Sequence, residues 1–319
     1  MFYFRAYGQI VESELALPEF EPLDPQECAP PIEPGLRIKL CALPHVPVEE
    51  RNAEGFRVRD GVIDFEVRGL VRIRVASQDC IEVDLLDAER QREARLYVTG
   101  SGFGIWVFAT GRIPFHCGLV TRDGLGFAIT GPSGVGKSTL TTALVERGFG
   151  FMSDDVVVLD PVDSAEDAGS VAITPSFPRI KLWQDAADHF AIETGALDRL
   201  HTEMDKFHVP FQQDKVVDRA TLAAVIRLQF DDTVKTPSCR AMPLPEALRE
   251  LRSNIYRPSL VTDLGLEETA FSLISTILQT VPVLDLARPR DLDRFEDTVE
   301  AFVSAVEGLD EPESSDLNA

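Results

Sequence analysis

The stretch ITGPSGVGKST, residues 129–139, indicates the fold, because residues 131–138 fit the pattern G-x-x-x-x-G-K-[ST]. The apolar run 125–130 before it predicts a strand, and residues 137–147 after it predict a helix that stops at Gly148. In a strand–loop–helix unit of this kind, backbone N–H groups and the helix N-terminus point at phosphate oxygens. The stretch therefore predicts a nucleotide-binding loop, a P-loop, in an α/β protein.

Each residue type in this loop has a chemical task. Glycines at 131, 134 and 136 let the backbone turn tightly around phosphate, the Lys137 ammonium reaches the β- and γ-phosphates, and the Ser138 hydroxyl can bind Mg²⁺. The expected cofactors are ATP and Mg²⁺. The predicted nucleotide-binding residues are Gly131, Pro132, Ser133, Gly134, Val135, Gly136, Lys137, Ser138 and Thr139.

Two interpretations compete for the catalytic carboxylates in FMSDDVVVLD, residues 151–160. In the first, Asp154 and Asp155 stand at the start of the next strand, where one supports the metal and the other takes a proton from the attacking hydroxyl. In the second, VVVLD is a Walker-B strand whose Asp160 binds the metal, as in motor ATPases and GTPases. The second interpretation lacks the other motifs of these proteins, because Pro161 follows Asp160 and no LSGGQ or NKxD motif occurs. We favour the first.

His116 lies in an apolar segment that a turn at 121–124 joins to the P-loop strand. A hairpin would bring the two segments together, and a histidine there could tune the proton affinity of a neighbouring aspartate. A single histidine among apolar residues is more often part of the core, and the residues alone favour that role for His116. Arg257, in IYRPSL, likewise has two interpretations: it stabilises transition-state charge, or it lies at a helix end before Pro258.

The order of these motifs resembles the C-terminal catalytic domain of the HPr serine kinase/phosphorylase family. The matching segments are FHCGLV (115–120), AITGPSGVGKST (128–139) and ALVERGFGFMSDDVVVLD (143–160). Three further segments are similar to the HPr-kinase-related proteins of lasso-peptide biosynthesis: FYFRAYGQIVESELALPEF (2–20), TPSFPRIKLW (174–183) and NIYRPSL (254–260). The core of the resemblance covers roughly residues 112–185.

This resemblance implies a P-loop kinase domain of the HPr kinase/PEP carboxykinase-like type, which transfers the γ-phosphoryl group of ATP to a serine hydroxyl. It implies that Asp154 is the general base, that Asp155 lies on the metal side with Ser138, and that His116 pairs with the base. Lys137 then contributes to catalysis as well as to binding. No segment resembles the family's second signature, EVAxxN, so the reverse reaction and docking to HPr are not implied.

The sequence predicts a β-rich N-terminal domain over residues 1–110, a catalytic domain over 111–307 and an acidic flexible tail over 308–319. Between residues 56 and 86 apolar residues alternate with polar ones, which predicts antiparallel strands, and 95–98 is expected to be another strand. Near the C-terminus, one apolar helical face is expected. It is made up of Leu292, Phe295, Val299, Phe302 and Val306.

The net charge argues against two classes of partner. The chain has 31 basic and 53 acidic residues, and the resulting net charge of −22 repels nucleic acid and anionic membranes. Five cysteines without a CxxC pair favour reduced thiols and a cytoplasmic protein, and no secretory signal is expected at the N-terminus. The favoured function is serine kinase activity on a peptide or small protein, with a lasso-peptide precursor preferred. A non-transferring ATP-dependent switch, a small-molecule kinase and a homo-oligomer remain open.

Overall fold

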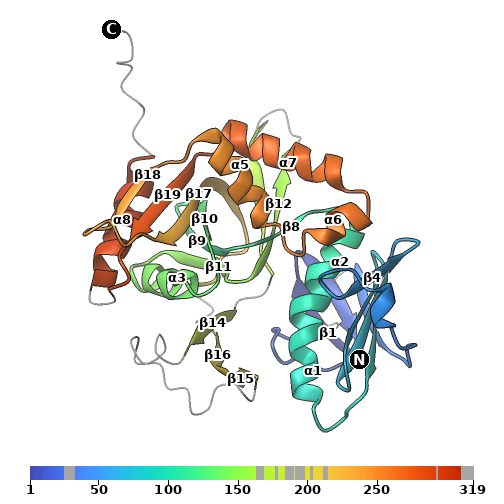
Figure 1. Cartoon of the computed structure of the whole chain (residues 1–319). Coiled ribbons are helices and arrows are strands. Elements are labelled where there is room, and N and C mark those ends of the chain that lie inside the picture. Colours follow the sequence, from blue (N-terminus) through green and yellow to red (C-terminus); the bar gives the residue numbers. More distant parts are fainter. Residues whose placement is uncertain are drawn as a thin grey trace.

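Two large β-sheets with helices packed against them make up most of the chain (Figure 1). The computed structural model describes residues 1–24, 33–162, 169–176, 179–183, 190, 198–201, 204–210, 215–291 and 294–309. The described helices include none long and apolar enough to cross a bilayer.

The first sheet is built from the N-terminal residues and has the strand order β1-β2-β3-β7-β6-β5-β4. Its strands are β1 (Phe2–Ala6), β2 (Gln9–Ser13), β3 (Leu36–Leu40), β4 (Phe56–Arg59), β5 (Val62–Val67), β6 (Val71–Ser77) and β7 (Cys80–Leu85), with a 3₁₀ turn at Val48–Glu50. The strands β4 to β7 form an antiparallel meander, as the alternating pattern predicts. Gly61 and Gly69 have positive φ in its turns, as expected for tight hairpin connections.

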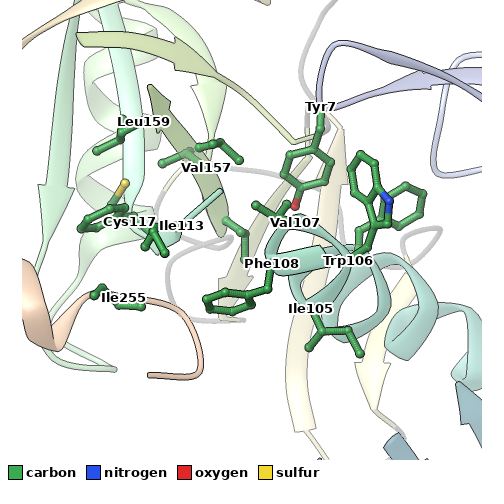
Figure 2. Close-up of a cluster of buried hydrophobic side chains, with 14 of the residues drawn as sticks. Tyr7, Ile105, Trp106, Val107, Phe108, Ile113, Cys117, Val157, Leu159 and Ile255 are labelled. Carbon is green, nitrogen blue, oxygen red and sulfur yellow. The ribbon is translucent and has the colours of Figure 1, made fainter. Parts of the chain in front are cut away.

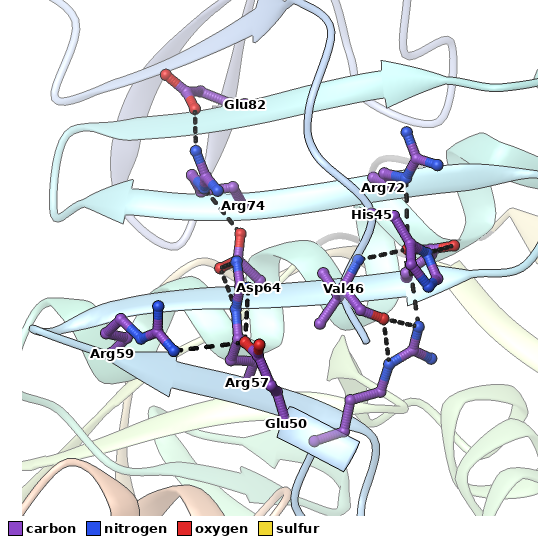
Figure 3. A network of polar contacts seen from close by, with 11 residues as sticks. His45, Val46, Glu50, Arg57, Arg59, Asp64, Arg72, Arg74 and Glu82 are labelled. Atoms are coloured by element: carbon purple, nitrogen blue, oxygen red, sulfur yellow. Dashed lines mark hydrogen bonds and ion pairs between the residues drawn. The ribbon is translucent and has the colours of Figure 1, made fainter. Parts of the chain in front are cut away.

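The alternation separates the two faces of this sheet. One face carries a ladder of ion pairs, in which Asp64 lies between Arg57 (2.6 Å) and Arg74 (2.7 Å), and Glu50 accepts from Arg57 (3.0 Å) (Figure 3). The other face buries aromatic rings, including Phe4, against the helical segment that follows. That segment contains α1 (Gln91–Tyr97), a π-helical turn (Val98–Gly102) and α2 (Phe103–Ala109).

The expected strand at 95–98 is wrong, because α1 covers most of it. Two apolar positions separated by one residue, Leu96 and Val98, fit a strand and a helix equally well over such a short window. The residues before them decide in favour of helix: Gln, Arg, Glu and Ala have high helix propensity, and Arg90 pairs with Glu93 three positions on.

The second sheet holds the P-loop strand near its middle, in the order β11-β9-β10-β17-β13-β12-β8, with β19 also beside β17 and β18 beside β19. Its strands are β8 (Pro114–His116), β9 (Gly118–Arg122), β10 (Leu125–Thr130), β11 (Gly150–Ser153), β12 (Val156–Pro161), β13 (Val171–Thr174), β17 (Ala220–Phe230), β18 (Ser238–Ala241) and β19 (Val283–Arg288). The expected strand and helix around the P-loop are present. The parallel neighbour of β10 is β17, however, so two strands, β17 and β13, lie between β10 and β12.

Helices cover both faces of the second sheet (Figure 1). The helices α3 (Lys137–Glu146) and α8 (Phe295–Glu307) share one apolar core with β10. On the other face lie α5 (Leu244–Ser253), α6 (Ser259–Asp263) and α7 (Glu267–Thr280). The expected apolar face of the last helix is confirmed at Phe295, Val299, Phe302 and Val306, all buried, whereas Leu292 lies outside the described residues.

A third sheet of the described chain lies near α3 and has the order β14-β16-β15. Its strands are β14 (Arg179–Trp183), β15 (Asp198–His201) and β16 (Met204–Pro210).

One apolar core extends across the two large sheets. Trp106 in α2 packs against the first sheet, where Tyr7 lies, and Phe108 of the same helix packs toward Ile113 and Ile255 of the second part (Figure 2). The domain boundary expected at residue 110 therefore stays a prediction: the sheets are separate, but their cores are continuous.

Candidate active site

The P-loop has the backbone shape that its glycines predict. Gly131, Gly134 and Gly136 all have positive φ, of 127°, 82° and 103°. A Cβ atom on Gly131 would lie 2.3 Å from the carbonyl oxygen of Leu228, so only glycine fits where the loop leaves β10. The Lys137 ammonium donates to the Gly131 carbonyl (2.8 Å), which holds the cation at the loop.

The two aspartates follow β11 and precede β12, and they face different partners. The Ser138 hydroxyl at the start of α3 donates to Oδ2 of Asp154 (3.0 Å), and Asp154 is 6% exposed. Gly118 makes room for Thr141 of α3, since a Cβ there would lie 2.7 Å from Thr141 Oγ1. Asp154 is thus the carboxylate next to the P-loop hydroxyl.

His116 lies near the other carboxylate, that of Asp155. The register of β8 against β12 pairs His116 with Val156, which brings Nε2 of His116 to 3.9 Å from Oδ1 of Asp155. The Cys117 N–H also donates to the backbone carbonyl of Asp155 (3.1 Å). The His116 side chain is 47% exposed, so the alternative of a core histidine is wrong. The sequence predicted this meeting of histidine and aspartate through the β9–β10 hairpin; the contact comes instead from β8 pairing with β12.

Two buried side chains, Cys117 and Tyr7, lie near the pair. Burial raises the pKa of the Cys117 thiol to about 12, so this cysteine stays a neutral thiol. Burial also raises the pKa of Tyr7 well above its usual value, and the charge of Asp155 adds to the increase. Tyr7 belongs to the β1–β2 turn of the first sheet, so the N-terminal part comes near Asp155.

The donors near the P-loop fit a nucleotide-bound magnesium ion. Mg²⁺ in phosphoryl-transfer sites is held by one or two protein oxygens together with substrate phosphates. Ser138 and Asp154 supply such a pair of oxygen donors. The described residues contain no cluster of three or more His, Cys, Asp or Glu that could hold a metal alone. The donor set therefore fits Mg²⁺ that arrives with ATP.

Asp160, the alternative metal ligand, lies at the far end of β12. Its carboxylate accepts from Nε of Arg112 (2.9 Å) and also pairs with the Nη2 atom of the same side chain. Arg112 Nη2 in turn donates to Thr174 (3.0 Å). These contacts give Asp160 a structural ion pair and favour the interpretation based on Asp154 and Asp155.

A cavity of about 630 Å³ opens beside the P-loop and contains site residues that the sequence did not predict. Its lining combines the P-loop, His116 and Asp155 with residues of the N-terminal part, namely Glu54, Leu96, Tyr97, Gly100 and Ser101. Residues 253–257 also line it. No local motif marks Glu54 or residues 96–101, because their position depends on how the two sheets pack.

A strand, glycine loop and helix that hold a lysine and a hydroxyl beside two carboxylates define a P-loop protein built to bind nucleoside phosphates. Residues 109–174 match the family model described as the HPr Serine kinase C-terminal domain. The resemblance to the HPr serine kinase family that the sequence indicates is therefore confirmed over this segment.

Curated relatives agree with this match. The HPr kinase/phosphorylase of Pelodictyon phaeoclathratiforme is 32% identical over 126 residues, which cover 37% of this chain and 36% of the relative. The HPr kinase/phosphorylase of Nitrosomonas europaea is 58% identical over 44 residues, 14% of each chain. The chain thus spans about a third or less of the length of these relatives.

A solved structure, the Hpr(Ser) kinase/phosphatase from Coxiella burnetii, is similar over 61% of this chain and 90% of its own, with 16% identity and a TM-score of 0.34.

Proposed function

We propose that this chain is an ATP- and Mg²⁺-dependent serine kinase that phosphorylates a peptide or small protein, with a lasso-peptide precursor as the preferred substrate class. The observation that carries the proposal is the division of the aspartates: Asp154 contacts the P-loop hydroxyl and Asp155 contacts His116. A phosphotransferase needs both a metal-side carboxylate and a base near the γ-phosphate.

These contacts favour an exchange of the roles that the family resemblance implied. Asp155, with His116 beside it and on the cavity wall, is the better candidate for the general base. Asp154, bonded to Ser138, is the better candidate for the metal side. Bound Mg²⁺ would neutralise charge on the β- and γ-phosphates.

The proposed transfer is a direct displacement. The serine oxygen forms a bond to the γ-phosphorus while the bond from that phosphorus to the bridging oxygen breaks, and ADP leaves with the electron pair. Asp155 takes the hydroxyl proton, and His116 stabilises the position and protonation of Asp155. Lys137 and the loop N–H groups bind the phosphates and spread the developing charge.

The first test is the intact mass of serine-containing peptides, a lasso-peptide precursor among them, after incubation with the protein and MgATP. A gain of one phosphoryl mass that disappears in Lys137→Ala is expected. Asp155→Asn should lose transfer by a factor of about 10² or more while it still binds ATP. Asp154→Asn should weaken the magnesium dependence of nucleotide binding. Full transfer by Asp155→Asn would refute the base assignment, and ATP binding without any transfer by the unmodified protein would refute the kinase.

A further inference from the structure

Arg257 reaches the cavity in a backbone conformation that arginine rarely adopts. Its φ is 52°, in the left-handed region that costs free energy for a residue with a Cβ. Such conformations persist where the surroundings impose them, and they are common at functional sites. The strain directs attention to what holds Arg257 in place and what its side chain faces.

Three sets of contacts hold the segment around Arg257. The first comes from β8: His116 N–H donates to the Asn254 carbonyl (2.7 Å), and Tyr256 N–H donates to the Pro114 carbonyl (2.8 Å). These bonds attach the segment to the strand that also positions His116. The segment around Arg257 and His116 are therefore held by the same strand, β8.

The second set links the segment to the entrance of the P-loop. Glu250 accepts from the hydroxyl of Thr130, the last residue of β10 (2.7 Å), and from the Asn254 amide (2.7 Å). Glu250 is 9% exposed, so these bonds lie inside the protein. They couple the end of α5 to the strand that enters the phosphate loop.

The third set comes from the N-terminal part. The Glu54 carboxylate accepts from both the N–H (2.9 Å) and the hydroxyl of Ser259, two residues after Arg257. The Asn52 amide donates to Ser259 (2.9 Å) and to Asp263 (2.7 Å). The loop before β4 thereby attaches the segment to the N-terminal part.

The guanidinium of Arg257 lies on aromatic rings without a carboxylate partner. Its central carbon is 5.5 Å from the ring centre of Phe56 and 5.2 Å from that of Tyr256. Its buried Nε has no hydrogen-bond partner, and no carboxylate of the described residues forms an ion pair with it. An arginine packed against rings keeps its donors available for a planar oxyanion.

The cavity around Arg257 also contains Lys137, His116 and Asp155. We propose that this cavity receives the phosphoryl acceptor and that Arg257 binds an oxyanion inside it. The oxyanion belongs either to the phosphoryl group during transfer or to an acidic group of the acceptor. This inference rests on the proposed kinase function and assigns the N-terminal sheet the task of positioning Arg257.

The test compares Arg257→Ala and Arg257→Lys with a matched control, Arg122→Ala. Arg122 also lies over an aromatic ring, that of Phe149 at 5.4 Å, but it pairs with Glu307 and is not part of the cavity wall. Two measurements are made on each protein: transfer to serine peptides, and the affinity for Mg·ADP with and without aluminium fluoride, which mimics the phosphoryl group in transit. Circular dichroism checks that each variant folds.

Arg257→Ala is expected to reduce transfer about 10²-fold and to leave Mg·ADP affinity unchanged, and Arg257→Lys is expected to restore little, because lysine lacks the planar fork. Loss of the extra affinity given by aluminium fluoride identifies the oxyanion as the phosphoryl group. A raised peptide KM with that affinity intact identifies an acidic group of the acceptor.

Arg257→Ala that matches Arg122→Ala in both measurements would overturn the inference. Failure of the kinase proposal is a separate result, because it shows as absent transfer in the unmodified protein. The fluoride measurement still tests Arg257 in that case: a lost affinity in Arg257→Ala supports the inference, whereas an unchanged affinity together with unchanged binding of an acidic serine peptide overturns it.

Discussion

Glu66 is a buried charge of the first sheet that pairs with His45 and Arg72. Burial alone would raise the pKa of its carboxyl. The Val46 N–H (2.9 Å), the His45 ring (2.8 Å) and Arg72 (3.3 Å) act in the opposite direction and outweigh burial, so the pKa of Glu66 is lowered. A carboxyl with a lowered pKa stabilises the fold above its unfolded pKa, and this stabilisation is lost as the pH falls through the folded value.

Glu66→Gln is therefore expected to reduce the free energy of unfolding by about 1–3 kcal/mol at pH 7. The difference from the unmodified protein should shrink as the pH falls from 4.5, the ordinary pKa of this group, toward the lowered pKa of the folded state, because Glu66 then loses its charge. Urea unfolding at pH 7 and pH 3.5 measures it. Glu82→Gln is the control: Glu82 is more exposed and lies 3.9 Å from Arg74, so its effect should be small at both pH values. A difference for Glu66→Gln that is equal at the two pH values would contradict the assignment.

At the scale of elements, α2 supports the Arg257 segment through one glycine. A Cβ on Gly104 would lie 2.5 Å from Cε1 of the Tyr256 ring, on which Arg257 rests. Gly104→Ala must therefore displace that ring. Since small displacements of positioning groups lower catalysis strongly, peptide transfer is expected to fall about tenfold while the affinity for ATP stays unchanged.

Gly102→Ala is the matched control for this prediction. A Cβ at Gly102 would make ordinary contacts, the shortest 3.6 Å, in the same helical segment. Both variants are assayed for transfer by intact peptide mass and for ATP binding by calorimetry. Equal transfer by the two alanine variants would show that the packing of α2 against Tyr256 does not position the site.

How much of these elements the sequence predicts depends on whether the signal is local. The P-loop and its helix follow from consecutive residues, and the meander of the first sheet follows from alternation, so both were predicted. The sequence does not predict that β17 lies beside β10, because β17 is about ninety residues further along the chain and only the completed sheet brings the two strands together. The aspartates were identified by their adjacency, whereas their separate partners, Ser138 and His116, depend on the turn between β11 and β12. The cavity wall from the N-terminal part carries no local signal at all.

At the scale of the whole molecule, the continuous core predicts that the two sheets unfold together. Phe108 is 2% exposed and lies in the core between Trp106 and Ile255 (Figure 2). Domains that share a large apolar interface lose their independent stability, so one transition is expected. Trp183→Phe leaves Trp106 as the only tryptophan, which reports on the first sheet, and a fluorescent ATP analogue reports on the P-loop.

Both signals should change at the same urea concentration. Phe108→Ala should lower both midpoints together, with a loss of about 3–5 kcal/mol in the free energy of unfolding, because the cavity it leaves borders both sheets. Nucleotide binding that persists after the Trp106 signal is lost would contradict this prediction and show that residues 1–110 fold as an independent domain. Coincident transitions mean that a substitution in the first sheet reaches the proposed acceptor cavity through stability as well as through geometry. For that reason the Arg257 and Gly104 variants need to be compared at equal fractions of folded protein.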